Sequence, residues 1–301
     1  MIHEIGGVNC AAATPLTADG APDFALFTRH CAALLTEGCH GLAILGTTGE
    51  ANSFSVAERQ ALLESALASG IRGDQLLPGT TACNLPETIA LTRHAVQAGA
   101  KGCLLLPPFY FKGVSTEGLY RFYAGVIEGV ADPRLRIILY HIPQTSQVPI
   151  THDLIERLMT DFPTTVVGLK DSSGDPANLA AMAERFPRLG VLVGADALML
   201  PLLRMGGAGC ITGTANLRAA DLRTLWDLWA DSARESEVSA AQDSIVAWRK
   251  LAVTYPMQST IKAMLARTRG NLGWLNLRPP LVALNAAECA VVWEAMARLG
   301  S

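Results

Sequence analysis

Short apolar runs alternate with amphipathic helical segments along most of the chain. Each run is rich in leucine or β-branched residues, and the segment after it repeats apolar residues with the helical period. Strands that are buried on both faces have continuous apolar sequences, so the runs are typical of a parallel sheet covered by helices. The predicted strands are 7–15, 41–46, 76–80, 102–108, 136–143, 165–172, 190–197 and 208–216.

Eight strand-and-helix units predict an α/β fold, the closed (β/α)8 TIM barrel. A doubly wound open sheet has the same alternation, but no glycine-rich dinucleotide turn follows the first run. The strand pattern stops near residue 234, and the sequence beyond it is helical in pattern. We therefore expect a barrel over residues 1–234 and a C-terminal helical extension over 235–301, packed on the barrel.

Composition narrows the class of protein. Half of the 301 residues are hydrophobic and the formal charge is only −3, without a basic run, which argues against nucleic acid or an anionic membrane as a partner. No apolar stretch reaches the roughly 18 residues of a membrane span, and the N-terminus lacks a signal pattern. Seven scattered cysteines without a CxxC pair are typical of core residues in a reducing compartment, so we expect a cytoplasmic protein.

Lys170 is the most informative residue, because it closes the apolar run at 165–172. The chain has five lysines and nineteen arginines, and only Lys170 lies at the end of a predicted barrel strand, where such barrels carry their chemistry. A desolvated lysine loses basicity, and a neutral amine attacks carbonyl groups to form a Schiff base. The alternative is an ordinary solvated lysine just past a strand.

Two further strand ends can assist such an amine. Tyr140, on the neighbouring predicted strand, can relay a proton, or it can be a buried tyrosine bonded to the backbone. The turn GTTGE at 46–50 offers amide groups and the hydroxyls of Thr47 and Thr48 to a small carboxylate, or it is a plain strand-to-helix turn. It lacks the Gly-Lys-Ser/Thr ending of a phosphate loop.

Other candidates are weaker. His141 alternates with Tyr140 in the pleat and should face away from it, which indicates a supporting role. The remaining histidines show no ligand spacing, and Asp171 and Asp175 are typical of loop and helix caps. These residues therefore predict no metal site.

Together these strand ends resemble the dihydrodipicolinate synthase / N-acetylneuraminate lyase family of pyruvate-dependent class I aldolases. A Tyr-x-x-Pro motif 30 residues before Gly-x-Lys, combined with GTTGE, is highly specific, and the resemblance covers nearly the whole chain. The matching motifs are Ala13-Thr14-Pro15, GTTGE (46–50), PPFY (107–110) with Ser115 to Tyr120, YHIP (140–143), VGLKDSSGD (167–175), GADA (194–197) and ITGTAN (211–216).

The resemblance implies roles at the matching positions. Lys170 would form an imine with pyruvate or another 2-oxo acid, while Tyr140 and Thr47 would relay protons. Thr47 and Thr48 would hold the pyruvate carboxylate, and the backbones of Gly194 and Ile211 would line the same pocket. Tyr110 matches a tyrosine that family members insert into the neighbouring subunit's site, which implies a homodimer or homotetramer.

One departure from the family pattern concerns the second substrate. Members that make dihydrodipicolinate carry an arginine five residues after the tyrosine, thought to grip the carboxylate of the incoming aldehyde, whereas this chain has Thr145. A charge-assisted bidentate contact contributes about 1.5–3 kcal/mol, which a hydroxyl does not replace, although Arg121 or another residue can compensate from elsewhere. Thr145 would then line the pocket for a different substrate.

Three functions follow. The first is a lyase that cleaves or forms a C–C bond to pyruvate, acting on a 4-hydroxy-2-oxo acid or a 2-keto-3-deoxy sugar acid. The second uses the same imine, either as a dehydratase of 2-keto-3-deoxy acids or as a 4-hydroxy-tetrahydrodipicolinate synthase using pyruvate and aspartate semialdehyde. The third is a non-catalytic ligand-binding barrel, which would have no need of a desolvated amine.

Overall fold

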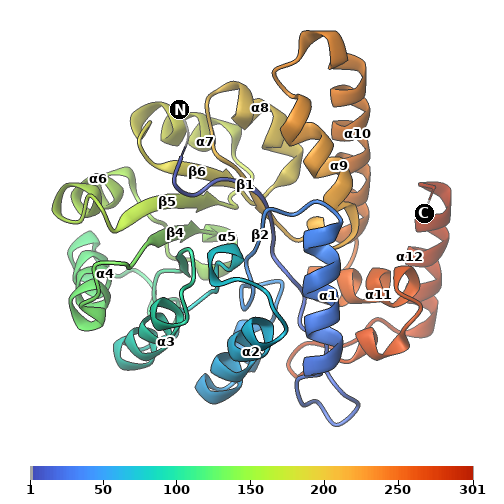
Figure 1. Ribbon diagram of the computed structural model, residues 1–301, viewed down its shortest axis with the longest axis horizontal. Helices are drawn as coiled ribbons and strands as arrows, with labels where there is room; N and C mark the ends of the chain where they lie inside the picture. Colours follow the sequence, from blue (N-terminus) through green and yellow to red (C-terminus); the bar gives the residue numbers. More distant parts are fainter. Residues whose placement is uncertain (1–2, 301) are drawn as a thin grey trace.

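Parallel strands curl into a barrel at the centre of the molecule, with helices around it (Figure 1). The structure is a computed structural model that describes residues 3–300. Seven strands follow one another in the order β2-β1-β7-β6-β5-β4-β3. Their bounds are β1 Gly7–Cys10, β2 Gly41–Leu42, β3 Cys103–Leu105, β4 Ile137–His141, β5 Val166–Asp171, β6 Gly190–Val193 and β7 Gly209–Thr212.

The predicted strand at 76–80 fills the gap between β2 and β3 without becoming a regular strand. The amide of Leu77 donates to the carbonyl of Leu42 at 2.9 Å, and the amide of Leu104 donates to the carbonyl of Pro78 at 2.9 Å. Pro78 has no N–H group, so the ladder is interrupted there and only isolated bridges remain. The expected TIM barrel is thus confirmed, while the expectation of a regular third strand is wrong.

Helices cover the outside of the barrel as the apolar period predicts. Ser55 and Glu58 form the capping box at the start of the helix that follows GTTGE, and Asp175 caps the helix after the Lys170 strand. The α-helices are α1 Phe24–Thr36, α2 Val56–Ala68, α3 Leu85–Gln97, α4 Thr116–Val130, α5 Pro143–Ser146, α6 His152–Asp161, α7 Pro176–Arg185, α8 Met199–Arg204, α9 Ala215–Leu228, α10 Glu235–Ala252, α11 Met257–Thr268 and α12 Ala286–Arg298. Short 3-10 helices are η1 Ala51–Ser53, η2 Gly73–Gln75, η3 Asp196–Leu198, η4 Ser232–Arg234 and η5 Leu272–Leu275. None of the described helices is long and apolar enough to cross a bilayer.

The strand pleat separates the barrel interior from the helix layer. On β4, Ile138 and Tyr140 belong to the interior cluster, while Ile137 and Leu139 pack against the surrounding helices. In the pairing of β4 with β5, Tyr140 lies opposite Lys170. Two polar side chains are therefore carried to the same end of the barrel interior by neighbouring strands.

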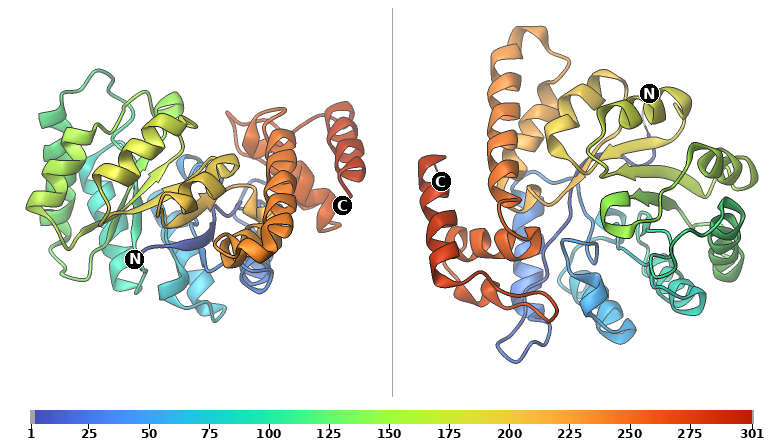
Figure 2. Two further views of the ribbon diagram at one scale, coloured as in Figure 1. Left: turned by 90° about the horizontal axis from the view of Figure 1, so that it is seen from above. Right: turned by 180° about the vertical axis from the view of Figure 1, so that it is seen from behind.

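The C-terminal helices α10 to α12 pack along one side of the barrel (Figure 2). They share a hydrophobic cluster with the barrel, in which Trp248 and Met264 of the extension pack with Leu26 of α1. Lys262 of α11 forms a buried ion pair with Glu50, the last residue of GTTGE. The extension thus contacts the loop that carries Thr47 and Thr48, while the domain boundary at residue 234 stays a prediction.

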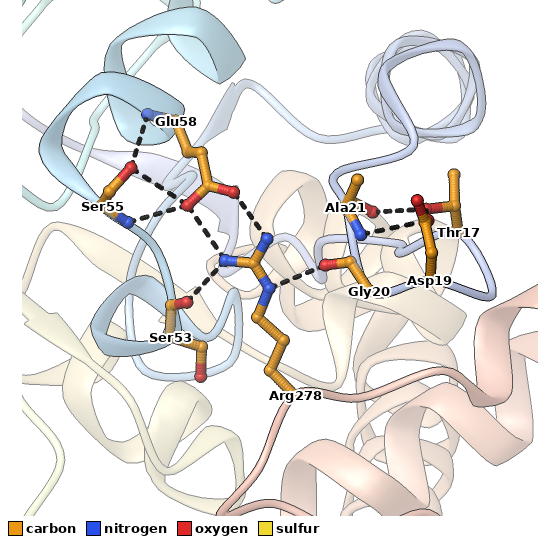
Figure 3. Close-up of polar contacts among 8 residues, drawn as sticks. All are labelled: Thr17, Asp19, Gly20, Ala21, Ser53, Ser55, Glu58 and Arg278. Carbon is orange, nitrogen blue, oxygen red and sulfur yellow. Dashed lines mark hydrogen bonds and ion pairs between the residues drawn. The ribbon is translucent and has the colours of Figure 1, made fainter.

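Arg278, in the segment before α12, makes a second clamp on this region (Figure 3). Its guanidinium donates to the carbonyls of Gly20 at 2.7 Å and Ser53 at 2.8 Å, and to Glu58 Oε2 at 2.9 Å. The hydrogen bond from Arg278 holds the pKa of Glu58 at about 2. One side chain therefore joins α2, the loop before α1 and the C-terminal segment.

Replacing Arg278 should destabilise the protein in a pH-dependent way. Because folding lowers the pKa of Glu58, the pair stabilises the native state above the ordinary glutamate pKa, and this contribution is lost as pH falls toward 2. For Arg278→Met we expect a modest decrease in Tm at pH 7 and a smaller one at pH 3, measured by thermal unfolding. Arg298→Met, which breaks the exposed pair with Glu294, should change Tm little at either pH. Equal losses of Tm at both pH values for Arg278→Met would contradict the stabilising role of the Arg278–Glu58 pair.

Candidate active site

Lys170 ends inside the barrel, next to Tyr140. Its side chain is on β5, only 4% of the residue is exposed, and Nζ lies 4.0 Å from the centroid of the Tyr140 ring. The other buried lysine, Lys262, is neutralised by Glu50, whereas no carboxylate among residues 3–300 forms an ion pair with Lys170. The Lys170 amine is therefore buried without a carboxylate partner, in a position where it can attack a carbonyl group of a bound substrate.

Thr47 joins this pair from the loop after β2. Its Oγ1 lies 3.3 Å from the hydroxyl of Tyr140, and Thr48 is buried beside it. No hydrogen bond joins the amide of either threonine to another described residue, so both N–H groups are available to a ligand. The loop turns sharply because Glu50 has a left-handed φ of 56° and its amide donates to the carbonyl of Thr47. The turn thus offers amide donors beside the proposed amine.

The hydroxyl of Tyr140 is tuned by its neighbours. Burial raises the pKa of this phenol, but the charge of Lys170 and the hydrogen bond with Thr47 act in the opposite direction, and the pKa of Tyr140 is lowered overall. A phenol with a lowered pKa gives up and recovers its proton more readily near neutral pH. The position of Tyr140 therefore fits proton transfer to and from a group bound at Lys170.

Ser172 belongs to this group, and the sequence reasoning missed it. It lies two residues after Lys170, and the pleat places alternate residues of an extended segment on the same side. A Cβ atom built on Gly194 would lie 1.9 Å from Ser172 Oγ and 3.2 Å from Lys170 Cε. At Gly194 the backbone after β6 therefore comes close to the side chains of Ser172 and Lys170. A side chain at position 194 would displace the Ser172 hydroxyl.

The other predicted residues are placed differently. Ile211, on β7, is fully buried in the interior cluster with Tyr140. Thr145 is exposed on the single turn of α5, and no hydrogen bond joins it to Lys170. Tyr110 is 73% exposed on the loop between β3 and α4, where its ring packs edge-to-face on Phe111. The structure therefore brings together Lys170, Tyr140, Thr47, Thr48 and Gly194, and leaves Tyr110 and Thr145 outside this group.

A small cavity lies behind Thr47 and Tyr140. It has a volume of about 20 Å³, and Arg59 and Thr81 also line it. This is room for about one water molecule. Within residues 3–300, no cluster of three or more His, Cys, Asp and Glu side chains has the arrangement of a metal site.

Comparison with known proteins decides the family. The model of the dihydrodipicolinate synthetase family matches residues 4–296. The chain belongs to this family. An uncharacterized DapA-like lyase of Chloroflexus aurantiacus is 35% identical over 98% of this chain and 97% of its own length. A 4-hydroxy-tetrahydrodipicolinate synthase of Rhizobium meliloti is 30% identical over 96% of this chain and 97% of its own.

Solved structures agree with the family assignment. The crystal structure of dihydrodipicolinate synthase from Agrobacterium tumefaciens superposes with a TM-score of 0.89 at 30% identity, covering 99% of this chain and 100% of that one. A prophage protein of the dihydrodipicolinic acid synthase family from E. coli K12, solved in complex with pyruvate, gives a TM-score of 0.90 at 26% identity, with 98% of each chain covered. Like other members of its family, the protein is a carbon–carbon lyase, which excludes the non-catalytic barrel.

Replacing Tyr140 tests the relay. Tyr140→Phe keeps the ring beside Lys170 but removes the hydroxyl, so we expect kcat to fall by about 10²- to 10⁴-fold. Steady-state turnover of pyruvate with an aldehyde is the measurement. Tyr120→Phe, which removes a surface hydroxyl bonded to Asp161, is the matched control and should retain full activity. A Tyr140→Phe variant with near-normal kcat would show that the proton moves by another route.

Proposed function

We propose that the protein condenses or releases pyruvate through a Schiff base on Lys170, acting as a class I aldolase. The observation that carries the proposal is the buried, uncompensated amine of Lys170 against the hydroxyl pair of Tyr140 and Thr47. The prophage relative that was solved with pyruvate supports a 2-oxo acid as the substrate. We expect no metal or organic cofactor in this reaction, since the imine supplies the electron sink.

The proposed reaction begins when the Lys170 amine attacks C2 of pyruvate. The carbinolamine loses its C2 oxygen as water, with protons moved by Tyr140, and the protonated imine remains. Loss of a proton from C3 gives the enamine, which attacks the aldehyde carbon, and the new alkoxide takes up a proton. Water then adds to the imine and releases the 4-hydroxy-2-oxo acid together with the free amine. In the reverse direction the same steps cleave the C–C bond.

The substrate carboxylate needs donors at the other end of the pocket. The amides of Thr47 and Thr48, which bond to no other described residue, would hold it together with the hydroxyl of Thr47. The backbones of Gly194 and Ile211 would complete the same wall. Binding at both ends fixes C2 against the amine, which favours attack by orientation.

For the second substrate, we propose a hydroxylated aldehyde, so that the product is a 4-hydroxy-2-oxo acid or a 2-keto-3-deoxy sugar acid. The reason is Thr145, which offers no positive charge to an aldehyde carboxylate. The rivals are the dehydratase on the same imine and the synthase reaction with aspartate semialdehyde, the reaction for which several relatives are named.

A panel of aldehydes with pyruvate separates these reactions. We expect glyceraldehyde and similar hydroxyaldehydes to react with a kcat/KM at least about tenfold above that of aspartate semialdehyde, because a bidentate charged contact contributes about 1.5–3 kcal/mol. Product analysis by mass spectrometry distinguishes C–C bond formation from loss of water. Equal or faster turnover of aspartate semialdehyde would favour the synthase.

The assembly and setting of the protein are also proposals. We expect a homodimer or homotetramer in which Tyr110 reaches the site of the neighbouring copy, since an exposed aromatic pair of Tyr110 and Phe111 is suited to an interface. We expect a cytoplasmic protein whose partners are small 2-oxo acids, with no nucleic acid or membrane partner.

A further inference from the structure

His141 lies at the end of β4, one residue after Tyr140, and makes hydrogen bonds on two sides. Its ring faces away from the barrel interior and is buried, and Nδ1 accepts a hydrogen bond from the amide of Ile150 at 3.1 Å. Its carbonyl accepts a hydrogen bond from the amide of Ser172 at 2.8 Å. The residue therefore ties the chain after Tyr140 to the chain after Lys170.

The ring of His141 closes the segment 142–150, which we call the β4 loop. The β4 loop leaves the barrel directly after the β4 strand and contains the single turn of α5. Gln144 Nε2 donates to the carbonyl of Ser172 at 2.7 Å, and Lys112 Nζ donates to the carbonyl of Ser146 at 2.8 Å. One end of the β4 loop is therefore covalently joined to His141, the residue after Tyr140, and the other end is held by the hydrogen bond to the His141 ring. Through Gln144 the β4 loop contacts Ser172, which lies with Lys170 beside Gly194.

The bond to Ile150 requires the neutral imidazole. An amide N–H can only donate, so Nδ1 must carry a lone pair, and the ring proton is on Nε2. A second proton would go to Nδ1, point at the N–H of Ile150 and break the bond.

Within residues 3–300, the titratable groups whose charges act on the ring come from two elements, β5 and α6. Asp171 is paired with His141 in the register of β4 with β5, and His152 begins α6. Burial lowers the pKa of His141 and the charge of His152 lowers it further, while Asp171 raises it; the pKa is lowered overall. The ring is thus neutral near pH 7, and the β4 loop is held closed there.

We propose that His141 is a positioning residue for the second substrate: its neutral ring holds the β4 loop in the geometry that receives the aldehyde. The inference rests on the proposed function, since the β4 loop contacts Ser172, which lies beside Gly194 with the proposed imine residue Lys170. It predicts a role in binding the aldehyde that is separable from imine formation with pyruvate.

Three variants and two readouts test this role. The side-chain oxygen of asparagine stands at about the distance of Nδ1 from the backbone, so His141→Asn keeps an acceptor for Ile150 but cannot titrate. His141→Gln and His141→Ala remove the acceptor from that position. Borohydride trapping of pyruvate reports imine formation, and KM for glyceraldehyde or aspartate semialdehyde, each used as a separate probe, reports the second substrate.

We expect His141→Ala and His141→Gln to trap pyruvate as the wild type does, and to raise KM for the aldehyde about five- to tenfold with little change in kcat. His141→Asn should restore KM at pH 7. In the wild type KM should rise as the pH falls below the ordinary histidine pKa, whereas in His141→Asn it should not. If His141→Ala does not fold, the pH profiles of KM for the wild type and His141→Asn still test whether the neutral ring of His141 positions the β4 loop.

Four results would overturn the inference. These are an unchanged KM in His141→Ala, an equal loss of trapping and turnover, an asparagine variant that is as impaired as the alanine variant, and turnover of neither aldehyde by the wild type. Failure of the proposed function is distinguishable, because the wild type would then trap no pyruvate at all.

Discussion

Lys170→Ala should abolish covalent capture of pyruvate and reduce turnover by on the order of 10⁴-fold or more, as expected for loss of a nucleophile. The alanine side chain has no amine to form the imine, so Tyr140 and Thr47 have no bound intermediate with which to exchange protons. Incubation with pyruvate and borohydride, followed by mass spectrometry of the peptides, should place a stable adduct on Lys170 in the wild type and none in the variant.

Lys101→Ala is the matched control for this experiment. Lys101 is exposed at the opposite end of the barrel strands, in the turn before β3, so its loss should leave both the adduct and the activity unchanged. An adduct that persists in Lys170→Ala, or one that maps to another lysine in the wild type, would end the proposed mechanism.

Lys262→Met should cause a large loss of stability, because it leaves Glu50 as a buried charge without a partner. Both side chains of this pair are almost fully buried, and the one other acceptor of Lys262 Nζ within residues 3–300 is the carbonyl of Asn276, at 2.8 Å. Burial raises the pKa of Glu50 and lowers the pKa of Lys262, and the attraction within the pair opposes both shifts. Removing one partner of a buried pair costs about 3–5 kcal/mol, so the midpoint of urea unfolding should fall markedly.

The double variant Glu50→Gln/Lys262→Met tests whether the unpaired charge is the cause. It removes both charges, and we expect it to recover much of the stability that Lys262→Met loses. Because Glu50 shapes the turn that carries Thr47 and Thr48, we expect the double variant to have a higher KM for pyruvate than the wild type. Lys250→Met, on the exposed face of α10, should leave stability unchanged. A double variant as unstable as the single one would assign the loss to packing of the lysine stem.

Much of the fold follows from local sequence patterns. Continuous apolar runs and helical periods predict the alternation of strands and helices in the barrel, and the spacing of Ser55 and Glu58 in the sequence is that of the capping box that begins α2. The exception is the segment 76–80, whose apolar character predicts a strand. Pro78 interrupts its hydrogen bonding, and apolar patterning does not register a missing N–H group.

The site was predictable where strand position alone decides it. Lys170 and Tyr140 lie at the ends of neighbouring strands, so their proximity follows from the barrel and the register. The contact of Gly194 with Ser172 depends on how closely two loops approach, and the ion pair of Lys262 with Glu50 joins segments far apart in sequence. Such contacts arise from tertiary packing, which no local pattern records.

The ion pair between α11 and the GTTGE turn has a consequence for the newborn chain. Ribosomes add roughly 5–20 residues per second, and about 210 residues separate Glu50 from Lys262. Lys262 is therefore synthesised roughly 10–40 seconds after Glu50. During that interval the carboxylate of Glu50 stays hydrated and the turn lacks its final support. A polypeptide released before α11 is made would therefore have nearly every residue of the reaction centre and still be inactive.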